Sequence, residues 1–183
     1  MKYIRKLVLS ILVISSFTLE ANQEDFQLIN KWGDDSQRPN RALTITERSG
    51  GVVFFDGNLG VNNSGKAGIY FTLTRHQLDA CALEDDGFMP MKDNVTGFRE
   101  TVYIVESQKI KMWEYCNLTR EGSRYLLATP KTEDGLKFII NKFKTKEVSE
   151  GVVHVVSPWV DGIDLSTFGF SNSWSSVNLD VAL

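Results

Sequence analysis

The chain has 183 residues, and its 20 basic and 23 acidic side chains give a formal net charge of −3 at neutral pH. This length suits one ordinary domain. The mild acidity excludes the excess of Lys and Arg with which proteins bind nucleic acids or anionic membrane surfaces. The charge is consistent with ordinary solubility, and it would also suit a basic protein partner.

Residues 1–21 show the pattern of a secretory signal peptide. Three basic residues lie near the start, a short apolar run covers residues 7–19, and Ala21 provides a small residue at which cleavage is predicted. The apolar run is shorter than the roughly 20 residues of a membrane-spanning helix. An uncleaved anchor and a buried N-terminal helix are the alternatives. We therefore expect a bacterial protein that is periplasmic or extracellular, with no stable membrane insertion after cleavage.

Cleavage would leave residues 22–183 as a single disulfide-containing domain. It removes three basic residues and one acidic residue, so 17 bases and 22 acids remain and the formal charge becomes −5. Both cysteines, Cys81 and Cys116, lie in this part. In an oxidising compartment, two cysteines most simply form one bridge, which here would stabilise the fold by about 4 kcal/mol in the chain-entropy model. Two free thiols are the alternative.

The first half of this domain is predicted to be rich in β-strands. Strands are expected over residues 41–47, 52–55 and 68–75. The last of these alternates strictly, which places Ile69, Phe71 and Leu73 on one face. The dipeptide Asp56-Gly57 after the second strand predicts a tight hairpin turn, because glycine accepts positive φ.

The second half begins with a predicted antiparallel meander. Its strands are expected over residues 100–106, 109–116 and 123–128, and the first two are joined by a turn at Ser107-Gln108. In the middle strand Ile110, Met112 and Cys116 share one face, so the half-cystine is predicted to point into the core.

One main helix is predicted near residues 132–146. Leu136, Ile139, Ile140 and Phe143 recur at the helical spacing, and Thr132 is placed to cap the first turn. A buried strand over 152–156 and a short helix from residue 171 complete the chain. The predicted fold class is therefore α+β: a β-rich single domain with an antiparallel sheet.

The segment Gly60 to Lys66 fits the beginning of a phosphate-binding loop. However, Ala67 replaces the hydroxyl residue of that motif, and a strand follows where the motif requires a helix. We therefore interpret the segment as a hairpin loop and predict no cofactor. No metal site is predicted either, because the chain holds only two histidines, His76 and His154, with no tightly spaced set of ligands around them.

No catalytic residues are predicted. The G-x-S-x-G elbow is absent, and a cysteine nucleophile conflicts with the disulfide. A pair of carboxylates could meet in the fold, but spacing along the chain does not identify it. Whether the protein is an enzyme is left open, and a non-enzymatic role is favoured.

An interaction surface is predicted around Trp159, Asp161 and Asp164. The indole follows Pro158 at the exit of a strand, and exposed aromatic residues are typical binding anchors. The functional hypothesis is an exported, non-enzymatic protein-binding domain, one version being an inhibitor or immunity-type protein. A secreted hydrolase using carboxylates and an envelope structural component are the alternatives. Glycosylation sequons begin at Asn62, Asn94 and Asn117.

Overall fold

The computed structural model describes residues 27–29, 31–33, 40–48, 51–92, 95–149 and 151–181. Side chains are described within these ranges, except those of 27–29, 47–48 and 178–181. The predicted signal peptide and the sequon at Asn94 lie outside the described residues. None of the described helices is both long and apolar enough to cross a membrane.

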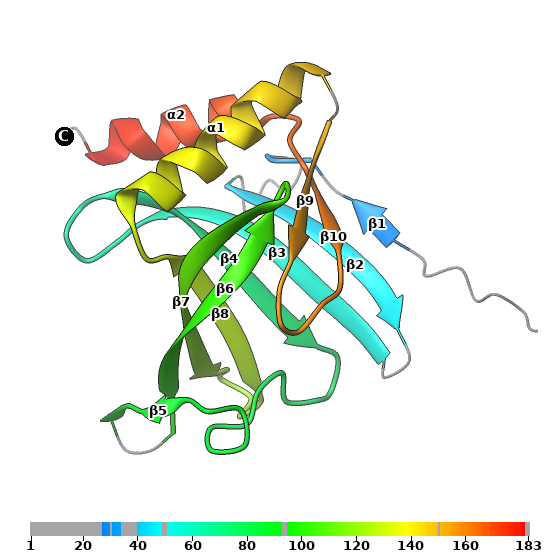
Figure 1. Ribbon diagram of the computed structural model, residues 1–183, viewed down its shortest axis with the longest axis vertical. Helices are drawn as coiled ribbons and strands as arrows, with labels where there is room; N and C mark the ends of the chain where they lie inside the picture. Colours follow the sequence, from blue (N-terminus) through cyan, green and yellow to red (C-terminus); the bar gives the residue numbers. More distant parts are fainter. Residues whose placement is uncertain are drawn as a thin grey trace, which may run out of the picture.

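A single antiparallel sheet dominates the described part of the chain (Figure 1). Its spatial order is β1-β2-β3-β4-β8-β7-β6-β9-β10, and β5 pairs with β6 beside this path. The predicted meander is confirmed, because β6, β7 and β8 are consecutive neighbours. The strands are β1 (Gln27–Ile29), β2 (Arg41–Arg48), β3 (Gly51–Val61), β4 (Ala67–Arg75), β5 (Met89–Pro90), β6 (Gly97–Val105), β7 (Gln108–Leu118), β8 (Arg124–Pro130), β9 (Val152–Val156) and β10 (Ile163–Ser166).

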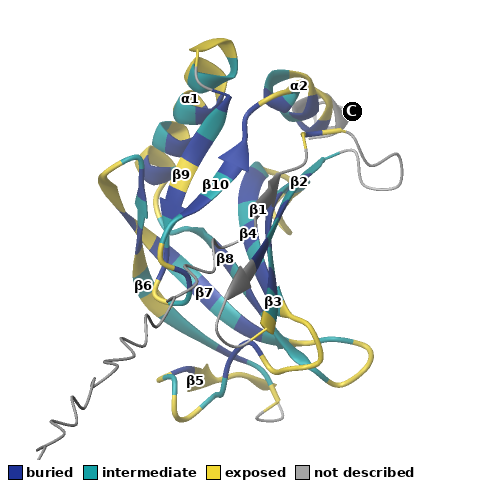
Figure 2. Cartoon of the chain, turned by 90° about the vertical axis from the view of Figure 1, so that its right-hand side faces the viewer, coloured by how far each residue is buried: buried dark blue, intermediate teal, exposed yellow. Residues whose placement is uncertain are grey.

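The sheet curls into a nearly closed barrel, with β10 returning alongside β2 (Figure 2). Side chains bridge this seam. Thr44 Oγ1 on β2 donates to the carbonyl oxygen of Asp164 at 2.6 Å, and Trp32 Nε1 donates to that of Ser166 at 2.5 Å. These two bonds give partners to backbone carbonyl groups of β10, the last strand of the sheet. Backbone groups that already have partners do not pair with another chain, so the bonds protect this edge of the sheet.

Two helices cover one end of the barrel (Figure 1). Helix α1 (Glu133–Ser149) begins at the predicted cap, where Thr132 Oγ1 accepts from the backbone N–H of Gly135 at 3.1 Å. Helix α2 (Phe170–Val181) confirms the predicted C-terminal helix. The rings of Trp32, Phe143 and Phe170 pack against one another with centroids 4.8 to 5.6 Å apart, so the helices close this end with an aromatic core.

The opposite end is crossed by the segment between β4 and β6, which carries β5 (Figure 1). The predicted disulfide is confirmed there, with the Sγ atoms of Cys81 and Cys116 joined at 1.97 Å. Both half-cystines are buried, as is Phe88 of the same segment. The bridge therefore fastens a long connection to β7 across the end of the barrel.

The predicted turn at Asp56-Gly57 is wrong, because β3 continues through both residues to Val61. Asp56 pairs with Arg41 on the neighbouring strand, Nε to Oδ1 at 2.8 Å. Gly57 faces the barrel interior, where a Cβ atom would lie 3.0 Å from Cη2 of Trp32. The glycine is therefore needed for close packing and not for a turn.

The meander turn differs by one residue from the predicted Ser107-Gln108. Glu106 and Ser107 form it, with φ values of 49° and 67°. Positive φ at both central residues is the geometry of a type I′ hairpin, which usually requires Gly or Asn.

Candidate interaction surface

A buried carboxylate lies inside the barrel on β7. Glu114 has no exposed surface, and its Oε1 accepts from the hydroxyl of Tyr103 and from Nε1 of Trp159, both at 2.7 Å. Its Oε2 accepts from Nε of Arg99 at 2.8 Å. Burial and the neighbouring Glu114 carboxylate raise the pKa of Tyr103 well above its usual value. Every oxygen of this carboxylate has a partner, so the cluster suits a structural role.

Arg99 joins this cluster to the two segments that close the barrel end. Its guanidinium lies beside two rings that stack on each other, with Cζ 4.6 Å from the centroid of Phe88 and 4.9 Å from that of Trp159. It also donates to the carbonyl oxygen of Asp86. The cluster therefore fixes the segment before β5 and the segment after β9 to the meander.

The structure places the three predicted interaction residues in different settings. Trp159 is half-buried with its indole N–H directed to Glu114, and Asp161 is exposed. Asp164 lies on β10, with Oδ1 2.8 Å from Nδ1 of His154. The interaction role of these residues stays a prediction, and the indole of Trp159 contributes to the interior network described above.

A second group of mostly aromatic residues lies on the outer face of β4, β8, β7 and β6 and was not predicted from the sequence. We call it the aromatic face and define it by Tyr70, Phe98, Trp113, Tyr115 and Leu127, each of which is partly exposed. Register places Phe98 opposite Tyr115 and Tyr115 opposite Leu127 in one row across three strands. The Phe98 centroid lies 5.8 Å from that of Trp113 and 6.4 Å from that of Tyr115.

Tyr70 joins this face from β4. Burial and the nearby phenol of Tyr115 raise the pKa of Tyr70 above its usual value. A sign of this face was present in the sequence. The alternation that turns Cys116 inward turns Trp113 and Tyr115 outward, and the alternation of β4 does the same for Tyr70.

Lysines border the aromatic face where it meets α1. Lys131 Nζ lies 4.5 Å from the ring centroid of Trp113 and pairs with Glu100. A groove with a volume of about 530 Å³ continues from Tyr70 to the first turns of α1. Its charged lining residues are Lys66, Lys131, Lys137 and Glu133.

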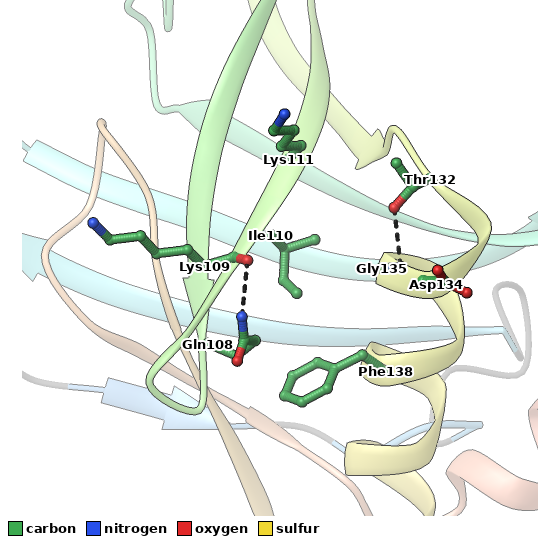
Figure 3. Close-up of a pocket in the computed structure, with 8 residues that line it drawn as sticks. All are labelled: Gln108, Lys109, Ile110, Lys111, Thr132, Asp134, Gly135 and Phe138. Carbon is green, nitrogen blue, oxygen red and sulfur yellow. Dashed lines mark hydrogen bonds between the residues drawn. The ribbon is translucent and has the colours of Figure 1, made fainter.

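A second, smaller groove of about 310 Å³ separates α1 from the β6–β7 hairpin (Figure 3). Phe138 and Ile110 contribute apolar surface to it, and the side chains of Lys109 and Lys111 extend away from the helix. Helix and strand approach closely at Gly135, where a Cβ atom would lie 3.1 Å from Cγ2 of Ile110. The N-terminal half of α1 is therefore bordered by a groove on each side.

The described residues contain no group of three or more His, Cys, Asp or Glu side chains that could hold a metal ion. No family model matches the chain, and neither curated proteins nor solved structures give a significant match.

The aromatic face and the groove beside α1 present aromatic and aliphatic surface next to positive charge.

Proposed function

We propose that this protein is an exported binding protein that recognises another protein through the aromatic face. The observation that carries the proposal is the group of partly exposed aromatic side chains, Tyr70, Phe98, Trp113 and Tyr115, on the outer face of the meander and β4. Tyr, Trp and Phe are enriched at the centres of protein interfaces, and a few such residues supply most of the binding free energy.

The neighbours of these rings also suit a protein partner. Leu127 lies between the aromatic residues, and Val102 on the same face of β6 is 44% exposed. Aliphatic and aromatic side chains together form the apolar centre of an interface. Glu100 lies opposite Trp113, between Phe98 and Val102 on β6, so its pair with Lys131 places one charged group within this surface.

Export is supported by two features. Residues 1–21 carry the composition of a signal peptide, and the disulfide between Cys81 and Cys116 is of the kind that persists in oxidising compartments. An inhibitor or immunity-type protein is one form of this function. A hydrolase would instead require titratable groups that converge in a pocket with access to substrate, and Glu114 is completely buried.

The test is affinity capture from the envelope and secreted fractions of the source cell, with the oxidised protein as bait and mass spectrometry as the readout. Trp113→Ser/Tyr115→Ser is the face variant. Leu78→Ser is the matched control, since Leu78 is 51% exposed in the segment after β4. Both baits must first show the circular dichroism spectrum and cooperative melting of the wild type.

The wild type and the Leu78→Ser bait are expected to capture one stoichiometric protein, and the face variant is expected to lose it. Equal capture by all three baits would contradict the role of the aromatic face. Capture of nothing, with a monomeric bait, would contradict the binding function itself.

A further inference from the structure

Resting on this proposed function, we propose that the partner presents an acidic segment with interspersed apolar side chains. Its carboxylates would lie in the 530 Å³ groove against Lys66, Lys131 and Lys137, and its apolar side chains would contact the aromatic face. This deepens the proposed function by assigning the chemistry of the partner at one surface.

The charge of this surface is opposite to that of the chain. The whole chain carries −3, yet three lysines and only one carboxylate line the groove. Lys111 extends the positive charge on the outer face of β7, two positions before Trp113. Opposite charges on two surfaces speed their association and suppress wrong partners. The net charge alone favours a basic partner, whereas the charge beside the aromatic face favours an acidic one.

Two lysines of this surface can accept new carboxylates. Among the described residues, neither Lys111 nor Lys137 forms an ion pair, and both side chains are exposed. The first turn of α1 also lines the groove through Thr132 and Glu133, so the positive end of the helix dipole adds to the attraction for an anion.

The chain itself already places one carboxylate in this groove. Oε1 of Glu133 lies 3.1 Å from Nζ of Lys66, and the pair is open to solvent, with side chains 74% and 71% exposed. Lys66 lowers the pKa of Glu133 by hydrogen bonding and charge. Exposed pairs of this kind contribute little stability and exchange readily, so a partner carboxylate can replace or join Glu133.

A polypeptide fits this surface better than an anionic glycan. Leu127 within the aromatic face and Val102 at its border, opposite Lys111, are aliphatic groups that offer no hydrogen bonds. Sugar hydroxyls placed over them would lose water without gaining partners, which costs free energy. Leucine or phenylalanine side chains of a peptide have no polar group there that would lose a hydrogen bond to water.

The test measures fluorescence anisotropy of a synthetic peptide, GEDLFEDLFEDG-amide, labelled with fluorescein at its amino terminus and titrated with the disulfide-intact protein. The same peptide with every Glu and Asp replaced by Gln and Asn is the charge control. Lys111→Glu/Lys137→Glu is the test variant. Lys144→Glu is the matched control variant, because Lys144 is exposed on the same helix but does not line the groove.

Wild type is expected to bind the acidic peptide at least about tenfold more tightly than the amide peptide, because charge pairing supplies the difference. The double variant should lose about tenfold or more in affinity, and Lys144→Glu should change it by less than about twofold. Amide chemical shifts should move at residues 66, 113, 115, 131 and 137.

Three outcomes would overturn the inference: no binding of the acidic peptide, equal losses in both variants, or stronger binding of sodium polygalacturonate at the same lysines. The affinity capture described above separates these failures from failure of the binding function. A captured partner that resists competition by the acidic peptide would retain the function and refute the acidic segment.

Discussion

Arg99 and Glu114 form an ion pair in the barrel interior, with Nε and Oε2 2.8 Å apart. The carboxylate has no exposed surface, and the arginine side chain is only 20% exposed. Such a pair is strongly coupled to the fold, because removal of one partner leaves the other charge buried without compensation.

Replacement of Arg99 by Met is therefore expected to destabilise the protein by about 3 to 5 kcal/mol, since Glu114 would keep only its two neutral donors. Urea unfolding followed by circular dichroism measures the change. The double variant Arg99→Met/Glu114→Gln is expected to recover much of this loss. A single variant within about 1 kcal/mol of the wild type would show that the pair does not hold the barrel end.

The raised pKa of Tyr103 leads us to expect a loss of stability at alkaline pH. Its folded pKa lies well above 10.0, so the folded protein favours the neutral phenol more than the unfolded chain does. The contribution of the neutral phenol to the free energy of unfolding is complete below the pKa that Tyr103 has in the unfolded chain. It is lost as the pH rises above about 10, by up to about 1.4 kcal/mol per pH unit.

The difference in unfolding free energy between the wild type and Tyr103→Phe, measured from pH 8 to pH 11, isolates the contribution of Tyr103. We expect the difference to shrink above pH 10. A difference independent of pH would show that the phenol ionises as readily in the folded as in the unfolded state.

Glu106 predicts a loss of stability at acidic pH. Although burial opposes ionisation, Lys146 Nζ at 2.7 Å and the backbone N–H of His154 at 2.6 Å lower the pKa of Glu106 below 4.5. The ionised Glu106 carboxylate adds to the free energy of unfolding above the pKa of about 4.5 that it has in the unfolded chain. This contribution is lost as the pH falls through the lower pKa of the folded protein.

Glu106→Gln should therefore be less stable than the wild type at pH 7, and the two proteins should converge as the pH falls toward 3. Thermal melting across this range provides the measurement. Lys144→Gln on the exposed side of α1 adds no group that titrates in this range, so it should not show the convergence, and its appearance there would refute the assignment to Glu106.

The disulfide predicts a large change in stability on reduction. It joins residues 35 apart in sequence, and replacement of both cysteines by Ala is expected to cost about 4 kcal/mol. The same loss should appear when dithiothreitol is added to the wild type and should be absent in the double variant. Equal unfolding midpoints with and without reductant would contradict this expectation.

Much of the fold was predictable because its signals are local. The signals for β4 and α1 depend only on residues a few positions apart: the alternation of residues 68–75, and the helical spacing around Ile139 and Phe143. Both predictions are confirmed. The turn at Asp56-Gly57 was wrong because the requirement for glycine comes from Trp32, which is distant in sequence.

The buried cluster around Glu114 and the assembled aromatic face could not be predicted from the sequence for a related reason. Glu114 sits at an inward position of β7, where its alternation alone would suggest an apolar residue, and its partners come from β6 and from the segment after β9. The aromatic face likewise depends on β8 lying between β4 and β7, an order that periodicity does not reveal.

The measurement that tests the aromatic face most directly is oxidative footprinting of the captured complex. Hydroxyl radicals label exposed side chains, and mass spectrometry reads the labelling of each residue in the free and bound protein. We predict that Tyr70, Trp113 and Tyr115 are labelled less in the complex, while exposed Leu78 and Phe168 are labelled equally in both. Unchanged labelling of the aromatic face, with protection elsewhere, would contradict the account.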